Sequence, residues 1–541
     1  MPDTLSAFSG GPMNASSRIA RALQRQTRLV PWLTVCLIGI AMVLLGAHRG
    51  DRFESPLGLA SPDSKLVEAF SWARQQASAY AFEGDAVGPW FEAALPGREA
   101  FCMRDVSHQA MGAHALGLQP HVRNMLRRFG GEISEARDWC SLWEIDRHGR
   151  PAHADYRSDD DFWYNLPANF DVLDASYRMY LWSGDPAYIT DPVLLGYYDR
   201  TVTDYVARWG LGLDAIMKRP RIMNRKTVAD PDAKFADSRG IPGYNEGSDD
   251  FVAGLDLLAT EYAGFKAYAR IQEARGDFAT ARVWLARAAE VRAFVNRTWW
   301  DEKTGAFFTH LGTDYRLAHR SRDSWNIGEL YWSVASDGAH LQAALARLAD
   351  QIGRSPSAPI EEQSHHPEVL YRYGAADLAY AQIMDLTRPG RARREYPEVS
   401  YAVVGAVVTG LMGIGVDPVT PGREADLLEY FAGQFVMTLP QLTAQTAWAE
   451  LQHLPVRAND VTVRHAGQSA TVFTNHRGPA IVWRAAFPGR HAELLVNGER
   501  IKASSQVRPP GRNVSFVRVV VGPGTSATVE VPAAAAGAER R

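Results

Sequence analysis

Carboxylates, amides and aromatic rings are concentrated in three stretches of the chain, each at or just before the start of an amphipathic segment. The stretches are FCMRDVSHQAMGAHALGL at 101–118, SDDDFWYNLPANFDV at 158–172 and GYNEGSDDFVAGLDLL at 243–258. Read as a helix, the first brings Asp105, His108 and Gln109 onto one face at the i, i+3 and i+4 spacings, among small residues that let neighbouring segments approach closely. Groups of these types can exchange protons with a substrate and hold it by hydrogen bonds. We therefore predict that the three stretches meet at one centre, the active site.

Amphipathic helices recur along the chain and could position such a centre. Leu341, Leu345, Leu348 and Ile352 show the helical spacing clearly, and turn signals such as Gly184-Asp185-Pro186 separate successive segments. The pattern predicts about twelve helices in sequential hairpins, which together form one domain over 61–454. Nine helices are expected at 61–84, 121–129, 165–183, 251–265, 284–295, 327–334, 341–352, 371–384 and 401–414. A further helix begins near 105, another ends at about 209, and two more lie between 424 and 451.

The pattern changes after Leu454 to short alternating runs. VTVRH, ATVFT, AIVWRAAF, AELLV, VSFVRVVV and ATVEV are separated by glycine, proline and asparagine, and Asn497-Gly498 is a hairpin signal. This pattern predicts a small antiparallel β-sandwich domain over 455–533. A disordered tail is expected at 534–541.

The N-terminal segment has the features of an export signal. Four arginines within residues 1–28 precede an uncharged run over 29–47, which as a helix would be about 28 Å long, close to the thickness of the hydrocarbon layer. The run is either a transmembrane anchor or a signal peptide cleaved after Ala47, and residues 48–60 would then be a linker. Both alternatives place the folded part outside the cytoplasm, in the periplasm or anchored to the inner membrane.

Composition excludes some classes of partner. The 58 basic and 61 acidic residues nearly cancel and no basic block recurs, so a nucleic-acid partner is not expected. The 15 Trp, 20 Tyr and 21 Phe suit stacking on sugar rings, although most of them should fill the core. Beyond the apolar run the chain has only Cys102 and Cys140, which are either a disulfide or two buried thiols. No redox-cofactor or nucleotide-binding motif is present, so no cofactor is expected.

Several strings resemble those of the six-hairpin glycosidases. They are MRDVSHQ (103–109), DFWYNLPANFDV (161–172), GYNEGSDDF (243–251), WNIGELYW (325–332) and REYPEVSYAVVGA (394–406). The resemblance covers about 61–451. The strings are similar to those of bacterial enzymes of glycoside hydrolase family 154. It implies a mainly α fold, an (α/α)6 toroid followed by the β-sandwich, and a β-glucuronidase activity on a carbohydrate substrate.

Glycoside hydrolysis requires one carboxylic acid and one carboxylate. Glu246, in a glycine-flanked loop ahead of a helix, is the predicted general acid. Its partner is predicted to be Asp105 or Glu398, both at the starts of helices built from small residues.

A uronic acid also needs a cation, for which the guanidinium fork of arginine is well suited. His365 and His366 are close in sequence to several glutamates, but the side chains of adjacent histidines point apart, so no metal site is expected. The predicted substrate-binding residues are Arg104, His108, Gln109, Asp161, Trp163, Tyr164, Asn165, Tyr244, Asn245, Arg322, Trp325, Asn326, Glu329, His365, His366 and Arg372.

Two other functions remain open from the sequence. The chain could be a polysaccharide lyase, because a toroid with a β-sandwich is also a lyase architecture; His108, Tyr244, His365 and Arg372 would then carry out β-elimination of a uronate polymer. It could also be a membrane-tethered carbohydrate-binding protein without turnover. The density of carboxylates in the three stretches favours an enzyme.

Overall fold

The computed structural model describes residues 53–93, 95–219, 239–244, 251–319, 327–336, 338–354, 359–416 and 435–533. The chain from Phe53 onward is one compact unit. The predicted N-terminal segments 1–28 and 29–47 and the tail 534–541 lie outside the described residues. Among the residues that are described, no helix combines the length and apolar character needed to cross a membrane.

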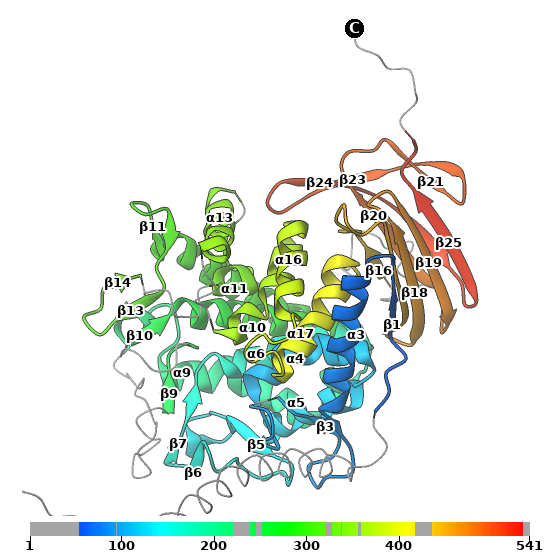
Figure 1. Cartoon of the computed structure of the whole chain (residues 1–541). Helices are drawn as coiled ribbons and strands as arrows, with labels where there is room; N and C mark the ends of the chain where they lie inside the picture. The colour runs from blue at the N-terminus through cyan, green and yellow to red at the C-terminus, as the bar shows by residue number, and fades with distance from the viewer. Residues whose placement is uncertain are drawn as a thin grey trace, which may run out of the picture. The chain divides into compact units, whose positions relative to one another are not determined.

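Six of the described helices form a closed inner ring, of which α4, α6, α10 and α17 are labelled in Figure 1. α4 packs against both α6 and α17, α10 packs against α6 and α12, and α15 packs against α17. The Tyr373 hydroxyl at the end of α15 donates to the Leu330 carbonyl of α12 at 3.1 Å and closes the ring. The inner helices are α4 (Met103–Leu116), α6 (Ala168–Ser183), α10 (Leu255–Ala274), α12 (Gly328–Tyr331), α15 (His366–Tyr373) and α17 (Pro397–Ala406).

Each inner helix is paired with an outer helix, as expected for an (α/α)6 toroid; for α6 and α8 the link is the Tyr197 hydroxyl, which donates to the Asn169 carbonyl at 3.1 Å. The outer helices are α3 (Ser64–Ala79), α5 (Gln119–Gly131), α8 (Pro192–Arg200) continued through η3 (Thr201–Tyr205) into α9 (Val206–Trp209), α11 (Phe278–Thr298), α13 (Ala339–Arg354) and α16 (Ala376–Leu386). The sequence predicted one helix over 371–384, which was wrong, because Gly374 (φ 85°) ends α15 and α16 begins at Ala376. This break makes the fifth hairpin.

The small residues of α4 allow the close packing that the sequence suggested. A Cβ at Gly112 would lie 2.1 Å from the carbonyl oxygen of Tyr401 in α17, so only glycine fits where these two backbones cross. The helix α4 begins directly after the short strand β4 (Ala100–Cys102), which pairs with β5 (Glu144–Asp146). Cys102 and Cys140 are both buried, and both are free thiols.

Two stacked sheets follow the toroid. Phe473 and Trp483 lie between them with stacked rings 5.2 Å apart. The larger sheet has the order β1 (Gly58–Ala60), β17 (Trp448–Val456), β18 (Asn459–Ala466), β19 (Ala470–Arg477), β25 (Thr525–Glu530), β21 (Glu493–Val496) and β22 (Glu499–Lys502). The smaller has the order β15 (Gly415–Val416), β16 (Phe435–Thr438), β20 (Ile481–Pro488), β24 (Arg512–Val521) and β23 (Ser504–Arg508).

The hairpin signal at Asn497-Gly498 is confirmed. Val496 and Glu499 pair across the turn between β21 and β22, and both turn residues have positive φ (50° and 87°), as a type I′ turn requires.

Three features of the sheets differ from the sequence prediction. Two helices were expected between 424 and 451, but the described part of this region, 435–451, contains the strands β16 and β17 and no helix; residues 424–434 lie outside the described residues. Short buried apolar runs such as FVMT at 435–438 cannot be told from helix by periodicity alone. The strand β16 pairs with β20 in parallel, so the sandwich is not purely antiparallel. The expected linker contains β1, which pairs with β17.

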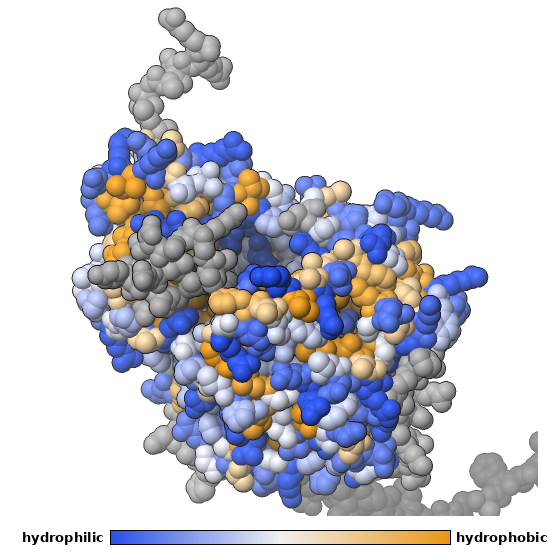
Figure 2. All heavy atoms as spheres, turned by 180° about the vertical axis from the view of Figure 1, so that it is seen from behind, coloured by the Kyte–Doolittle hydropathy of each residue, from blue (hydrophilic) through white to orange (hydrophobic). Residues whose placement is uncertain are grey.

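The surface of the described chain is of mixed polarity. Figure 2 shows hydrophilic residues over most of one face, with hydrophobic residues in scattered patches. The large apolar side chains that remain exposed include Phe278 and Val283 on α11, Val507 on β23 and Val520 on β24.

Candidate functional site

Every inner helix has a carboxylate in its first turn. They are Asp105, Asp171, Asp256, Glu329, Glu368 and Glu398, on α4, α6, α10, α12, α15 and α17 respectively. Each inner helix leads into the next through an outer helix, so the six run in the same direction and their first turns meet at one end of the ring. All but Glu368 are buried, at 2–7% exposure. A helix N-terminus stabilises negative charge, which helps the fold to hold several carboxylates so close together.

Asp105 and Glu398 form one carboxyl pair across α4 and α17. Arg104 Nε donates to Asp105 Oδ1 at 3.1 Å, and the carboxyl groups of Asp105 and Glu398 are hydrogen-bonded to each other. Burial raises the pKa of Glu398 well above its usual value, and the neighbouring charge of Asp105 raises it further. Two carboxyl groups can share a hydrogen bond only if one holds a proton, so Glu398 is the protonated member.

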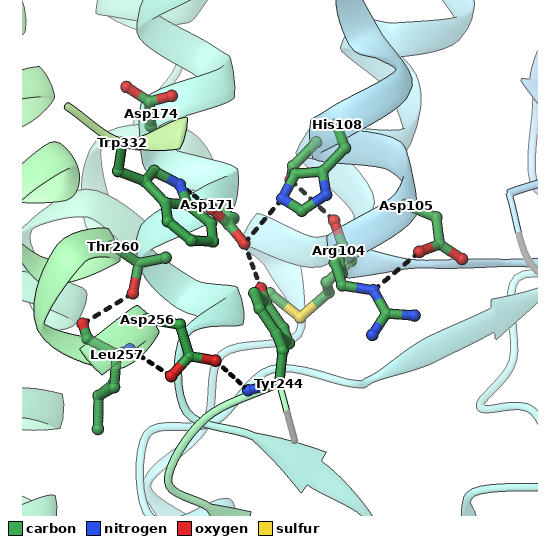
Figure 3. A network of polar contacts seen from close by, with 12 residues as sticks. Arg104, Asp105, His108, Asp171, Asp174, Tyr244, Asp256, Leu257, Thr260 and Trp332 are labelled. Carbon is green, nitrogen blue, oxygen red and sulfur yellow. Dashed lines mark hydrogen bonds and ion pairs between the residues drawn. The ribbon is translucent and has the colours of Figure 1, made fainter. Parts of the chain in front are cut away.

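Asp171 is the centre of a second network, shown in Figure 3. Its carboxylate accepts hydrogen bonds from the Tyr244 hydroxyl and from Trp332 Nε1 at 2.9 Å, and His108 Nε2 lies 3.3 Å away. The first-turn carboxylate of the next helix, Asp256, accepts from the backbone N–H groups of Tyr244 and Leu257. Asp256 therefore holds the backbone of Tyr244 in place while Asp171 orients its ring.

Several of the described residues place a ring next to His108. The His365 ring lies 4.8 Å away, and those of Tyr331 and Tyr244 lie at 5.1 Å and 6.1 Å. The Arg104 guanidinium lies 5.3 Å from the Tyr244 ring and so connects this aromatic group to the carboxyl pair. Burial, reinforced by the charges of His108 and Arg104, lowers the pKa of His365 well below its usual value, so His365 is neutral.

The aromatic string 161–165 is divided between the site and the core. Trp163 packs edge-on against Trp143 at 4.6 Å, and Trp143 in turn lies 5.8 Å from the Arg104 guanidinium. Tyr164, in contrast, is fully buried, and its hydroxyl donates to Asn169. The structure places Asn165 in the interior as well, and pairs Asp161 with Arg157 at 3.4 Å.

The other predicted binding residues have several different surroundings. Arg372 donates to Glu368 at 2.6 Å and to the Tyr331 carbonyl, so it braces α12 against α15. His366 lies 3.4 Å from Glu362. The Gln109 amide is buried, with no hydrogen-bond partner among the described residues. The predicted site residues Asn245, Glu246, Arg322, Trp325 and Asn326 lie outside the described residues.

Glu329 lies near the outer helix α13, beside Ala344 and Arg347. Glu329 lines a small cavity of about 20 Å³ together with Asp256, Thr309 and Arg347. A cavity of this size can hold one water molecule. Burial raises the pKa of Glu329 to about 7, so its carboxyl titrates near neutral pH.

The titration of Glu329 should appear in the stability of the protein. Because its folded pKa of about 7 is above the unfolded value of 4.5, the native state binds a proton that the unfolded state loses, and stability falls as pH rises between these values. The span corresponds to on the order of 3 kcal/mol. In urea unfolding, Glu329→Gln should remove this part of the pH dependence, whereas Glu290→Gln on the exposed face of α11 should not. Parallel pH curves for wild type and Glu329→Gln would contradict the prediction.

The sequence interpretation missed Asp171, Asp256, Trp332 and Trp143. Asp171 and Asp256 both stand inside strings that were singled out, each in the first turn after an irregular polar segment. The usable signal was the position of the carboxylate relative to the start of the helix. The glycines around Asp256 are a further signal, since a Cβ at Gly254 would lie 2.1 Å from its Oδ1.

Comparison with known proteins identifies the fold. No family model matches the sequence, and no curated protein matches it. An α-L-rhamnosidase from Dictyoglumus thermophilum is similar in structure, with a TM-score of 0.53 and 12% identity over 88% of this chain and 50% of the rhamnosidase. A putative kojibiose phosphorylase from human microbiome has a TM-score of 0.52 and 9% identity over 94% of this chain and 68% of the other.

A native rhamnosidase from Aspergillus terreus is comparable, with a TM-score of 0.52 and 12% identity over 87% of this chain and 51% of that enzyme. The chain spans about half the length of the two rhamnosidases. At these identities the likeness concerns the fold alone. The chain has a six-hairpin glycosidase-like fold, and these structural neighbours are glycoside hydrolases and a phosphorylase.

Proposed function

We propose that the protein is a glycoside hydrolase whose general acid is Glu398. The observation that carries the proposal is the buried, hydrogen-bonded pair Asp105–Glu398 at the point where the inner helices converge. A general acid must hold its proton at the working pH and release it to the departing oxygen. Burial and the charge of Asp105 raise the pKa of Glu398, so that Glu398 holds its proton at the working pH.

The same geometry requires another residue to be the second carboxylate. Carboxylates that flank a glycosidic bond are separated by about 5–5.5 Å in retaining enzymes and about 6.5–9.5 Å in inverting ones, so a directly hydrogen-bonded pair is too close. Asp171 is occupied by Tyr244 and Trp332. We assign water activation or nucleophilic attack to Glu246, which follows Tyr244 by two positions. The acid role predicted for Glu246 therefore passes to Glu398.

A β-glucuronide is the substrate we propose. Arg104 is the described arginine beside the carboxyl pair, and its guanidinium lies next to the Tyr244 and Trp143 rings. A guanidinium recognises a carboxylate in a fixed planar geometry, and aromatic rings suit the apolar faces of a sugar.

Release of chromophore from chromogenic glycosides tests the function. The full chain would be assayed on a β-glucuronide, an α-L-rhamnoside and neutral β-glycosides, each with and without inorganic phosphate. Release from the glucuronide without phosphate supports the proposal; release from another glycoside overturns the substrate and keeps the reaction class. Release that depends on phosphate would indicate a phosphorylase.

The lyase and binding alternatives have their own readouts. A lyase would make an unsaturated, ultraviolet-absorbing product from a uronate polymer, but burial and Asp171 raise the pKa of Tyr244 well above its usual value, which makes this tyrosine a poor base. Binding of a saccharide without turnover of any would indicate a carbohydrate-binding protein.

A further inference from the structure

A pocket of about 520 Å³ lies between the outer helix α13 and the hairpin formed by β11 (Trp300–Asp301) and β12 (Ala306–Phe307). Figure 1 shows β11 beside α13. The described residues that line the pocket include no first-turn carboxylate of an inner helix, so the pocket is separate from the carboxyl pair on α4 and α17. They are Thr304, Gly305 and Ala306 of the hairpin, Ala346, Arg347 and Asp350 of α13, and His319.

Hydrogen bonds to Asp301 shape the hairpin side of the pocket. The Asp301 carboxylate accepts from the Thr304 hydroxyl at 2.7 Å and from the Lys303 backbone N–H at 3.0 Å. His319 Nε2 lies 2.9 Å from the same carboxylate and 3.2 Å from the Thr304 hydroxyl oxygen. Two of the polar side chains that line the pocket, those of Thr304 and His319, are therefore held in place by one carboxylate.

A ring contact fixes the hairpin on the helix. The Trp300 ring stacks on the His340 ring of α13, with centroids 4.0 Å apart. Between these two walls stand the small residues Gly305, Ala306 and Ala346, which leave the space that larger side chains would fill. The pocket is thus part of the packed arrangement of the hairpin and α13.

The polar groups of the pocket include both donors and acceptors. Arg347 and Asp350 carry opposite charges, and Arg347 forms no hydrogen bond or ion pair with a residue that the structure describes. Asp350 Oδ1 pairs with Arg354 at 2.7 Å on the exposed side of α13. A guanidinium only donates, a carboxylate only accepts and the Thr304 hydroxyl does both, which suits the hydroxyl groups of a sugar. A simple anion would meet the carboxylate of Asp350.

We propose that this pocket binds a segment of a neutral saccharide through Arg347, Asp350 and Thr304. Its volume is within the range of about 300–1,000 Å³ that is usual for small-ligand sites. Ala306 and Arg347 also line the small cavity that contains Glu329, so the pocket is next to the first turn of the inner helix α12. The proposal goes beyond the hydrolase proposal and does not depend on it, because binding in this pocket requires no turnover.

Hydrogen exchange of the full chain, followed by mass spectrometry, tests the site. Maltose or cellobiose should slow amide exchange in 300–307 and 339–354 by about threefold when its concentration is twice the dissociation constant. Ala346→Trp, which fills the pocket from an exposed position on α13, should abolish this slowing. Ala349→Trp, which changes an exposed alanine of the same helix outside the pocket lining, should keep it.

A second variant removes an acceptor without filling the pocket. Asp350→Ala changes a half-exposed side chain of α13 and should reduce the slowing in the same two segments. Equal slowing in wild type and Ala346→Trp, or no slowing of 300–307 and 339–354 by either sugar, would overturn the proposal.

Two further outcomes separate this proposal from the others. Slowing confined to 103–116 and 397–406 would place the saccharide at the carboxyl pair alone, which would overturn the pocket proposal and leave the hydrolase proposal unaffected. Slowing of 300–307 and 339–354 by glucuronate but by neither neutral sugar would assign the pocket to an anion and would also overturn the proposal.

Discussion

Replacing Glu398 with glutamine is expected to lower kcat on the accepted glycoside by about 10³-fold, within the range for loss of a general acid. The amide cannot protonate the leaving oxygen, although it keeps the size of the side chain and can still hydrogen-bond Asp105. Steady-state hydrolysis at several pH values measures the effect. The matched control is Glu368→Gln, which changes the first-turn carboxylate of α15, a residue that pairs with Arg372 instead of with a carboxyl group. Its kcat should stay within a few-fold of wild type.

Stability should change in the opposite direction to activity. Because burial and Asp105 raise the pKa of Glu398, the native state keeps a proton that the unfolded state loses above the ordinary glutamic acid pKa. The wild type therefore loses stability as pH rises above that value, and Glu398→Gln does not. The free energy of unfolding of the variant, relative to wild type, should increase with pH.

Asp105→Asn provides an independent test of the pair. Removing the charge of Asp105 removes one cause of the raised pKa of Glu398, so the alkaline limb of the pH–rate profile should move to lower pH. Full activity in Glu398→Gln, with an unchanged profile in Asp105→Asn, would exclude the pair from catalysis.

The toroid could be predicted from sequence because its signals are local. Apolar residues at helical spacing marked most of the helices, and glycines marked their ends. The short α12 was within an expected helix, but its four-residue length depends on how α10, α13 and α15 pack around it. The strands β16 and β17 were mistaken for helices because their positions are set by pairing with other strands. β16 pairs with β20, which is distant in sequence, and β17 pairs with β18, which follows it.

The candidate site was only partly predictable, for a different physical reason. Asp105 and Glu398 were recognised one at a time, each as a carboxylate at the start of a helix built from small residues. Their union depends on the contact of α4 with α17, almost 300 positions later in the chain, where Gly112 meets Tyr401. Asp171 was overlooked because a carboxylate in the first turn of a helix is common and often only stabilises the helix N-terminus. Only the structure shows that the Tyr244 hydroxyl and Trp332 Nε1 donate to it and that His108 lies beside it.

Asp171→Asn is expected to cost about 3 kcal/mol in the free energy of unfolding, because it leaves buried donors without their charged acceptor. The Tyr244 hydroxyl and Trp332 Nε1 both donate to this carboxylate, and His108 lies beside it, so one substitution disturbs three elements of the site wall. Urea unfolding measures the loss. Tyr244→Phe and Trp332→Phe each remove one donor and should cost about 1–2 kcal/mol, the range for a hydrogen bond to a charged group.

The cost of Asp171→Asn in a variant that lacks both donors decides whether Asp171 acts as the centre of the network. In the double variant Tyr244→Phe/Trp332→Phe, a further Asp171→Asn change should cost much less than it does in the wild type, because the donors that needed the charge are gone. Asp204→Asn, which breaks an exposed pair with Arg200, should leave stability almost unchanged. An undiminished loss in the double-variant background would mean that Asp171 stabilises the ring through the N-terminus of α6 and not through the donors around His108. The aromatic wall beside the carboxyl pair would then need another support.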